Sequence, residues 1–331
     1  MKQNLQEFID FQLANEQTTR KISALEHDGI TKLSALFYTV ANQNADLDKI
    51  KKSREILKNK MGIFSNFRGA FDLVISSKMS LAEDPEKYLD DVIDIYKKLV
   101  SDKKIPGETY VMTAITIYEQ AGNQDIDSII NQTKEAYAKI KEQHKYLTDE
   151  TDMSFIAMMV MSGKDIDKTV NEVEETFNVL KQEYKVPSDA AQGAALVLSM
   201  SDKSVQEKCK AFMDLYTEMK AKKQQTSKNR CMVIYAACVV VNMPQSEVVE
   251  AMSETELILK KHQGYGALTG GQDIRRVFAG ALVILNQLLS DGDSGSVGRE
   301  TNLVSNVVTQ EVIDAIMLMV YFTNVDIFLF I

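Results

Sequence analysis

The chain has 331 residues, 45% of them hydrophobic and 26% charged, with a formal net charge of −9 at pH 7. This composition is typical of a folded globular protein and argues against intrinsic disorder. The acidic balance argues against a nucleic-acid-binding protein, because contact with the phosphate backbone requires clustered cations.

Residue types favour helix along nearly the whole chain, because Lys, Glu, Ala, Met and Leu dominate and long alternations of Val, Ile and Thr are missing. We therefore predict an all-α fold. The amino terminus contains no apolar core of signal-peptide length. Cys209, Cys231 and Cys238 fit buried thiols in a reducing compartment better than a disulfide framework. We expect a cytoplasmic protein.

Residues 1–46 carry two helical patterns. Leu5, Phe8 and Leu13 recur at helical spacing, and a second apolar run extends from Ile30 to Val40. Between them, His27–Gly29 supplies a break in which glycine tolerates positive φ. We expect these two helices to cap an array that follows.

From residue 47 onward, a pattern of about 40 residues occurs six times. An apolar residue lies in the last turn of the first helix of each unit, and these residues are Leu57, Leu99, Ile140, Leu180, Met219 and Leu259. A short polar corner follows, and then a second helix rich in small and apolar residues. We predict six αα-hairpin repeats over residues 47–289, stacked as an α-solenoid, with a curled or closed α/α toroid as the alternative.

Residues 290–300 are rich in Gly, Ser and Asp, which predicts a flexible linker. Residues 301–331 form an apolar segment that predicts a final helix. Asp314 and Asp326 interrupt this segment, and an aspartate near the bilayer centre costs roughly 2.5 kcal/mol or more. The sequence therefore argues against membrane insertion and favours docking of the segment onto the array or onto a partner.

Polar residues gather at the corners between paired helices. The third corner contains His144, Thr148, Asp149 and Asp152. Other corners add Arg68, Arg230, His262 and Asp273. If the units stack regularly, these side chains lie along one edge and form a ligand-binding groove or pocket. Imidazole and carboxylate groups perform acid–base catalysis or bind metals, so His144, Asp149 and Asp152 are the catalytic candidates.

A structural interpretation of the same corner stands beside the functional one. Thr148 or Asp149 is positioned to cap a helix, because either side chain accepts a hydrogen bond from a free backbone N–H. His144 falls near a helix C-terminus and Asp152 falls in a first turn, where each charge is favourable. Each of these residues is therefore explained without a ligand.

Arg68 also has two interpretations. Its planar guanidinium is suited to clamp a carboxylate or a phosphate, and it is equally suited to pair with Asp72 or Asp152. The glycine-rich corner 264–273 lacks the Gly-Lys-Ser/Thr ending of a phosphate-binding loop, and no tight His/Cys spacing of a zinc site is present. We therefore predict no metal and no cofactor.

Three motifs give the chain a resemblance to a known family. F-S-x-F-R-G stands at Phe64–Gly69, H-x-[aromatic]-L-T followed by Asp stands at His144–Asp152, and Tyr-x-x-[apolar]-Lys recurs about every 40 residues. The chain up to residue 290 resembles the family catalogued as domain of unknown function 4003. The matching positions are Phe64, Phe67, Arg68, Gly69, His144, Tyr146, Leu147, Thr148 and Asp152. Lys145 stands where the family pattern has proline. The resemblance implies a cytoplasmic bacterial protein, mainly from Firmicutes, with no assigned activity.

These patterns favour a binding or scaffold module for a protein, a peptide or a small acidic ligand, because each unit of a helical array adds side chains to one surface. The alternative is an α/α-toroid enzyme, with or without a metal, that uses His144, Asp149, Asp152 and Arg68 in a central pocket. A third interpretation is a scaffold held at a membrane by the C-terminal segment. No motif specifies a reaction, so the sequence favours binding and leaves catalysis open.

Overall fold

The computed structural model describes residues 5–22, 28–145, 147–241, 243–266 and 271–292. Within these ranges it contains fourteen α-helices, three short 3-10 helices and no strand, so the expected all-α class is confirmed. None of the helices in these ranges has the length and apolar character needed to cross a membrane. The last helix of the described residues ends at Gly292. The rest of the expected linker and the expected helix at 301–331 lie outside the described residues.

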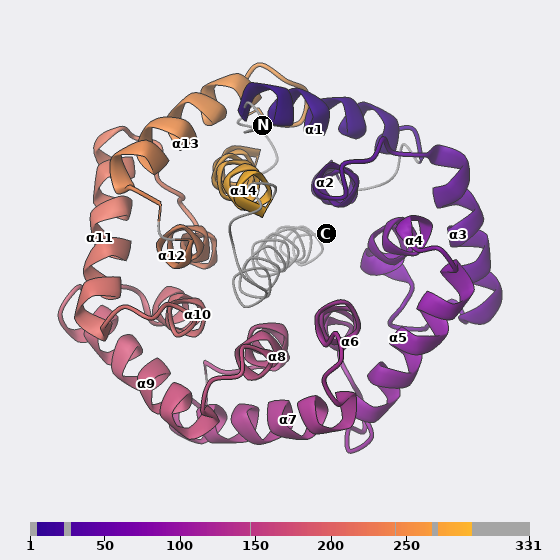
Figure 1. Cartoon of the computed structure of the whole chain (residues 1–331), viewed down its shortest axis with the longest axis horizontal. Coiled ribbons are helices and arrows are strands. Elements are labelled where there is room, and N and C mark those ends of the chain that lie inside the picture. Colours follow the sequence, from indigo (N-terminus) through magenta and orange to yellow (C-terminus); the bar gives the residue numbers. More distant parts are fainter. Residues whose placement is uncertain (1–4, 23–27, 146, 242, 267–270, 293–331) are drawn as a thin grey trace, which may run out of the picture.

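The helices form two concentric layers in a ring (Figure 1). The outer layer contains α1 (Leu5–Thr19), α3 (Leu47–Lys60), α5 (Pro85–Leu99), α7 (Ile126–Gln143), α9 (Ile166–Gln182), α11 (Val205–Ala221) and α13 (Gln245–Leu259). The inner layer contains α2 (Asp28–Val40), α4 (Asp72–Leu81), α6 (Thr109–Gln120), α8 (Met153–Met161), α10 (Ser188–Leu198), α12 (Val233–Val240) and α14 (Gly271–Gly292). Each outer helix and the inner helix after it form a hairpin. The 3-10 helices η1 (Gly69–Phe71), η2 (Glu150–Asp152) and η3 (Asn229–Met232) lead into α4, α8 and α12.

The first and last hairpins close the ring. Helix α14 contacts α1 and α2, while α2 also contacts α4 of the second hairpin. Tyr265, before α14, donates a hydrogen bond to Glu16 of α1, and Arg20 Nη2 donates to the Gln263 carbonyl at 2.8 Å. An open array would leave these ends apart. In the described residues the first and last hairpins are therefore in contact, and the helices form a closed ring (Figure 1).

Burial explains why the helices separate into two layers. Outer helices bury one stripe, and in α5 the buried residues are Tyr88, Leu89, Val92, Ile95 and Leu99. Inner helices are buried on all sides, and in α8 every residue from Met153 to Met161 is buried. A helix that is apolar around its whole circumference needs cover on all sides, whereas an amphipathic helix belongs at the surface. The residue pattern of each helix therefore determines its layer.

The corners that lead from outer to inner helices contact a neighbouring corner or the start of a neighbouring inner helix around the ring. Asn66 Nδ2 donates to the Pro106 carbonyl of the next corner at 2.9 Å. Two bonds reach the first turns of α10, from Gln192 Nε2 to Thr148 Oγ1 (3.4 Å) and from Asn229 Nδ2 to Asp189 Oδ1 (3.1 Å). The inner helices joined in this way begin on the same side of the ring. We call this side the corner face.

The C-terminal ends of three inner helices are tied to the start of the outer helix in the same hairpin. These contacts are made by the side chains of Gln124, Lys164 and Lys203. Each of the three residues directly precedes the N-cap of an outer helix. They donate to the carbonyls of Met161 (3.3 Å), Ser199 (3.1 Å) and Val239 (3.4 Å). The last carbonyls of a helix have no partner within it, so these bonds satisfy groups that are otherwise unpaired.

Candidate functional site

The third corner of the predicted array brings His144 and Thr148 against the next hairpin. His144 is the C-cap of α7, and its Nε2 contacts the carboxylate of Glu174 in α9. Its ring packs on Phe177 with the centroids 4.3 Å apart. Thr148 is buried, and its hydroxyl accepts a hydrogen bond from Gln192 of α10. Both side chains therefore join neighbouring hairpins.

Asp149 and Asp152 form a capping box around η2. Asp149 accepts a hydrogen bond from the Thr151 N–H at 2.9 Å, and Asp152 accepts one from the Asp149 N–H at 3.2 Å. These bonds satisfy backbone donors that a helix start leaves free. No group of three or more His, Cys, Asp or Glu side chains in the described part of the chain is arranged to hold a metal ion.

Arg68 takes part in an ion-pair group at the start of α4. Its Nε lies 2.9 Å from Asp72 Oδ2, and Arg54 of α3 pairs with the other oxygen of the same carboxylate. The Asp72 side chain is 7% exposed and the Arg68 side chain is 17% exposed. The pair with Arg54 links α3 to α4, and removal of the shared Asp72 carboxylate would take this partner from both arginines.

The remaining sequence candidates lie at later corners. His262 is exposed beyond the end of α13. Asp273 is buried in the first turn of α14, where it accepts a hydrogen bond from the Ser227 N–H at 2.6 Å and another from the Ser227 hydroxyl. The side chain of Arg230 lies outside the described part of the structure. The structure thus distributes the candidates around the corner face and brings together only those of the third corner.

A buried ionic cluster, which the sequence analysis did not identify, lies where the ring closes. Its members are Glu16, Arg20, Asp28, Lys32 and Tyr265. Lys32 is fully buried, pairs with Asp28, and places Nζ 4.5 Å from the centroid of the Tyr265 ring. Burial raises the pKa of Glu16 and lowers the pKa of Lys32, because a low-dielectric surrounding disfavours their charged forms.

Perturbed pKa values occur at functional sites and also in structural ion networks. In this cluster the groups are partners of one another, and the Tyr265–Glu16 hydrogen bond spans 249 positions of sequence. No local sequence pattern carries a signal for such a contact. We infer that the cluster stabilises the closed ring.

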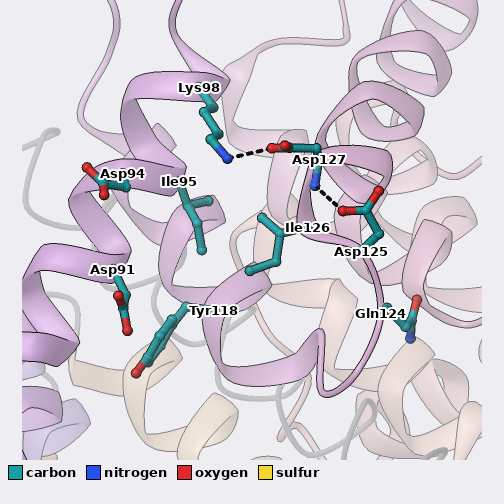
Figure 2. A pocket seen from close by; sticks show the side chains of 9 residues that line it. All are labelled: Asp91, Asp94, Ile95, Lys98, Tyr118, Gln124, Asp125, Ile126 and Asp127. Atoms are coloured by element: carbon teal, nitrogen blue, oxygen red, sulfur yellow. Dashed lines mark hydrogen bonds and ion pairs between the residues drawn. The ribbon is translucent and has the colours of Figure 1, made fainter.

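A groove with an acidic lining lies between α5 and the start of α7 (Figure 2). Its volume is ≈ 460 Å³. The apolar part of the lining comes from Ile95, Tyr118 and Ile126. The charged part comes from Asp91, Asp94, Asp125, Asp127 and Lys98. Four carboxylates against one ammonium group make the groove a candidate site for a cation.

Two of the four carboxylates have structural partners within the groove. Asp127 pairs with Lys98 at 2.6 Å, and Asp125 is the N-cap of α7 (Figure 2). Asp91 and Asp94 instead pair with lysines of their own helix at 2.6 and 3.3 Å. Exposed intrahelical pairs contribute about 0.3–0.5 kcal/mol, so a cationic ligand is able to replace either lysine at small cost.

A second groove lies at the starts of α9 and α11 and has a volume of ≈ 740 Å³. Its lining includes the cations Lys164, Lys168 and Lys203 and the anions Asp165, Glu172, Glu175 and Asp202. Three cations nearly balance four anions. Of the two grooves, the one between α5 and α7 has the larger excess of negative charge. We call it the acidic groove.

Comparison with known proteins identifies a family and no characterised relative. No curated protein and no solved structure matches the chain. The model of the family described as "Protein of unknown function (DUF4003)" matches residues 16–315. This range begins within α1 and includes all the later helices of the ring, and it confirms the resemblance carried by the sequence motifs. The chain therefore belongs to the DUF4003 family.

Proposed function

We propose that the protein is a binding module that takes up a cationic segment of a partner protein in the acidic groove. The observation that carries this proposal is the lining of four aspartates and one lysine around an apolar floor. A lysine or arginine side chain suits such a lining, because its aliphatic stem covers apolar surface while its charge meets carboxylates.

The acidic groove does not suit the small acidic ligand that the sequence also allowed, because its carboxylates repel an anion. The enzyme alternative has no specific support either. His144, Asp149 and Asp152 are engaged in contacts that hold helices and corners together. A protein or peptide partner is therefore the preferred ligand class.

The proposal includes the repeat interpretation of the hairpins and a location in the cytoplasm. Support for repeats comes from the two grooves. When the units are aligned on Leu99 and Leu180, Asp91 and Asp94 correspond to Glu172 and Glu175, which line the second groove. Equivalent positions of different hairpins thus line similar grooves. Support for a reducing compartment comes from the three cysteines, which are buried and unpaired.

Titration with a fluorescein-labelled oligolysine peptide at low salt tests this function by fluorescence anisotropy. We expect the Asp91→Asn/Asp94→Asn variant to bind roughly fivefold more weakly, since two exposed charge pairs contribute together about 1 kcal/mol. Asp10→Asn/Asp214→Asn is the matched control, because it removes the same charge from the exposed Asp10 on α1 and the half-exposed Asp214 on α11. Equal weakening in both variants would show an effect of net charge alone and would refute the groove as the site.

A further inference from the structure

Two neighbouring corners on the corner face expose large apolar side chains. In the described residues, large apolar side chains that are highly exposed occur at four positions: Ile63 (73%), Phe64 (95%), Ile105 (93%) and Leu257 (55%). Ile63 and Phe64 lie in the corner between α3 and α4, and Ile105 lies in the corner between α5 and α6. Three of the four thus fall in two adjacent corners, whereas Leu257 lies on α13.

The two corners are fixed to each other, so their apolar side chains form one surface. Asn66 Nδ2 donates to the Pro106 carbonyl at 2.9 Å and to Tyr96 Oη at 2.8 Å. The buried ring of Phe67 packs edge-on against Tyr96 with the centroids 5.1 Å apart. Phe64 therefore extends outward from a corner whose neighbouring residues are anchored. We call Ile63, Phe64 and Ile105 the apolar tip.

Lysines flank the apolar tip in the sequence. Residues 58–68 contain Lys58, Lys60 and Arg68 and no acidic residue, and the corner 100–108 contains two lysines, Lys103 and Lys104, and two acidic residues, Asp102 and Glu108. Lys60, Arg68 and Lys103 pair with carboxylates. Lys58 and Lys104 are exposed and have no ion-pair partner among the described residues. Two exposed lysines without an ion pair thus stand beside the tip, on a chain whose net charge is −9.

We propose that the apolar tip is a peripheral membrane contact that inserts into the surface of an anionic lipid bilayer. Apolar side chains enter the boundary between headgroups and acyl chains, and the lysines meet anionic headgroups. A bilayer suits a protruding tip better than a protein does. A standard protein interface buries about 800 Å² per partner, and an aromatic side chain supplies only about 150–250 Å². A bilayer requires no matching pocket and no such area.

This contact also sets the orientation of the ring. Ile105 lies just before the start of α6, and Tyr118 of the acidic groove lies near the end of the same helix. A helix of twelve residues is about 18 Å long, so the two sites lie at opposite ends of α6. A ring docked through the apolar tip therefore presents the acidic groove away from the lipid. The two proposals rest on different residues, and each stands if the other fails.

Vesicle flotation of the full chain tests the contact. The probes are vesicles of phosphatidylcholine alone and vesicles of phosphatidylcholine and phosphatidylglycerol in equal parts. We expect binding to the anionic vesicles, weaker binding at high salt, and at least tenfold weaker binding of Phe64→Ser/Ile105→Ser. Leu257→Ser is the control, because it removes an exposed apolar side chain from α13 and leaves the tip intact. Circular dichroism checks that all variants fold.

Three results would overturn the proposal. The first is no binding of the wild-type chain to anionic vesicles. The second is undiminished binding of Phe64→Ser/Ile105→Ser, which would assign the lipid contact to another segment. The third comes from the photoreactive amino acid p-benzoylphenylalanine placed at position 64 in cells. Cross-links to lipid support the membrane contact, whereas cross-links to a protein alone would make the tip a protein-docking surface.

Discussion

Replacement of Gly264 by alanine should weaken the closure of the ring. Gly264 has φ +83°, a backbone conformation that disfavours residues with a Cβ atom. A Cβ at this position would lie 2.5 Å from Lys32 Nζ and 2.6 Å from Arg20 Nη2, and closer still to Asp28. The substitution therefore strains the backbone and also displaces charged groups of the buried cluster.

The magnitude of the effect follows from these two contributions. An alanine with left-handed φ costs about 1–2 kcal/mol. Displacement of the charged groups adds about 2 kcal/mol, because Lys32 is fully buried and its charge is paired with Asp28. We expect Gly264→Ala to lower the free energy of unfolding by about 3–4 kcal/mol in total.

Urea unfolding followed by circular dichroism measures this difference, with Gly163→Ala as the control. Gly163 has φ +76°, close to that of Gly264, but no atom lies within 4 Å of its added Cβ. The control carries the backbone strain without the clash and should cost about 1–2 kcal/mol. Equal destabilisation of the two variants would show that the ionic cluster does not hold the ring closed.

Three further outcomes are expected at the corners and in the core. Asp273→Asn should lower the free energy of unfolding by about 1–2 kcal/mol in urea titrations, because it weakens two hydrogen bonds from Ser227. His144→Ala should lower the midpoint of thermal unfolding and leave oligolysine binding unchanged, since its contacts are structural. Burial raises the pKa of Cys231 and Cys238 from 9.0 to about 12, so the stability they contribute is full below pH 9.0 and is lost as the pH rises through about 12. The Cys231→Ala/Cys238→Ala variant should show a flatter decline of the unfolding free energy between pH 9.0 and about 12. A slope equal to that of the wild type would contradict a contribution of the two buried thiols.

Helices and their layers follow closely from local sequence. The outer helix α5 buries residues at every third or fourth position, and the inner helix α8 is an uninterrupted apolar run. Both patterns are visible in the chain and determine which helix faces water. Asp84 before Pro85 likewise marks the start of α5, because its side chain accepts from two backbone N–H groups of the first turn.

The corners show what the local sequence does not determine, namely the contacts that a polar side chain makes in the folded chain. His144 and Asp152 stand out in the sequence because their residue types suit catalysis. In the folded chain, His144 meets Glu174 and Phe177 of the next hairpin, and Asp152 completes a capping box. Whether a polar side chain binds a ligand or a neighbouring helix depends on what lies opposite, and that information is not local.

Local residue types and periodicity were sufficient for the all-α class, because helix formation depends on residues within a few turns of one another. Ring closure depends on the contact between Tyr265 and Glu16, which no local pattern encodes. The acidic groove and the apolar tip depend in the same way on which hairpins become neighbours. Only the packing of successive hairpins sets the curvature of the array, and the curvature decides which distant side chains meet.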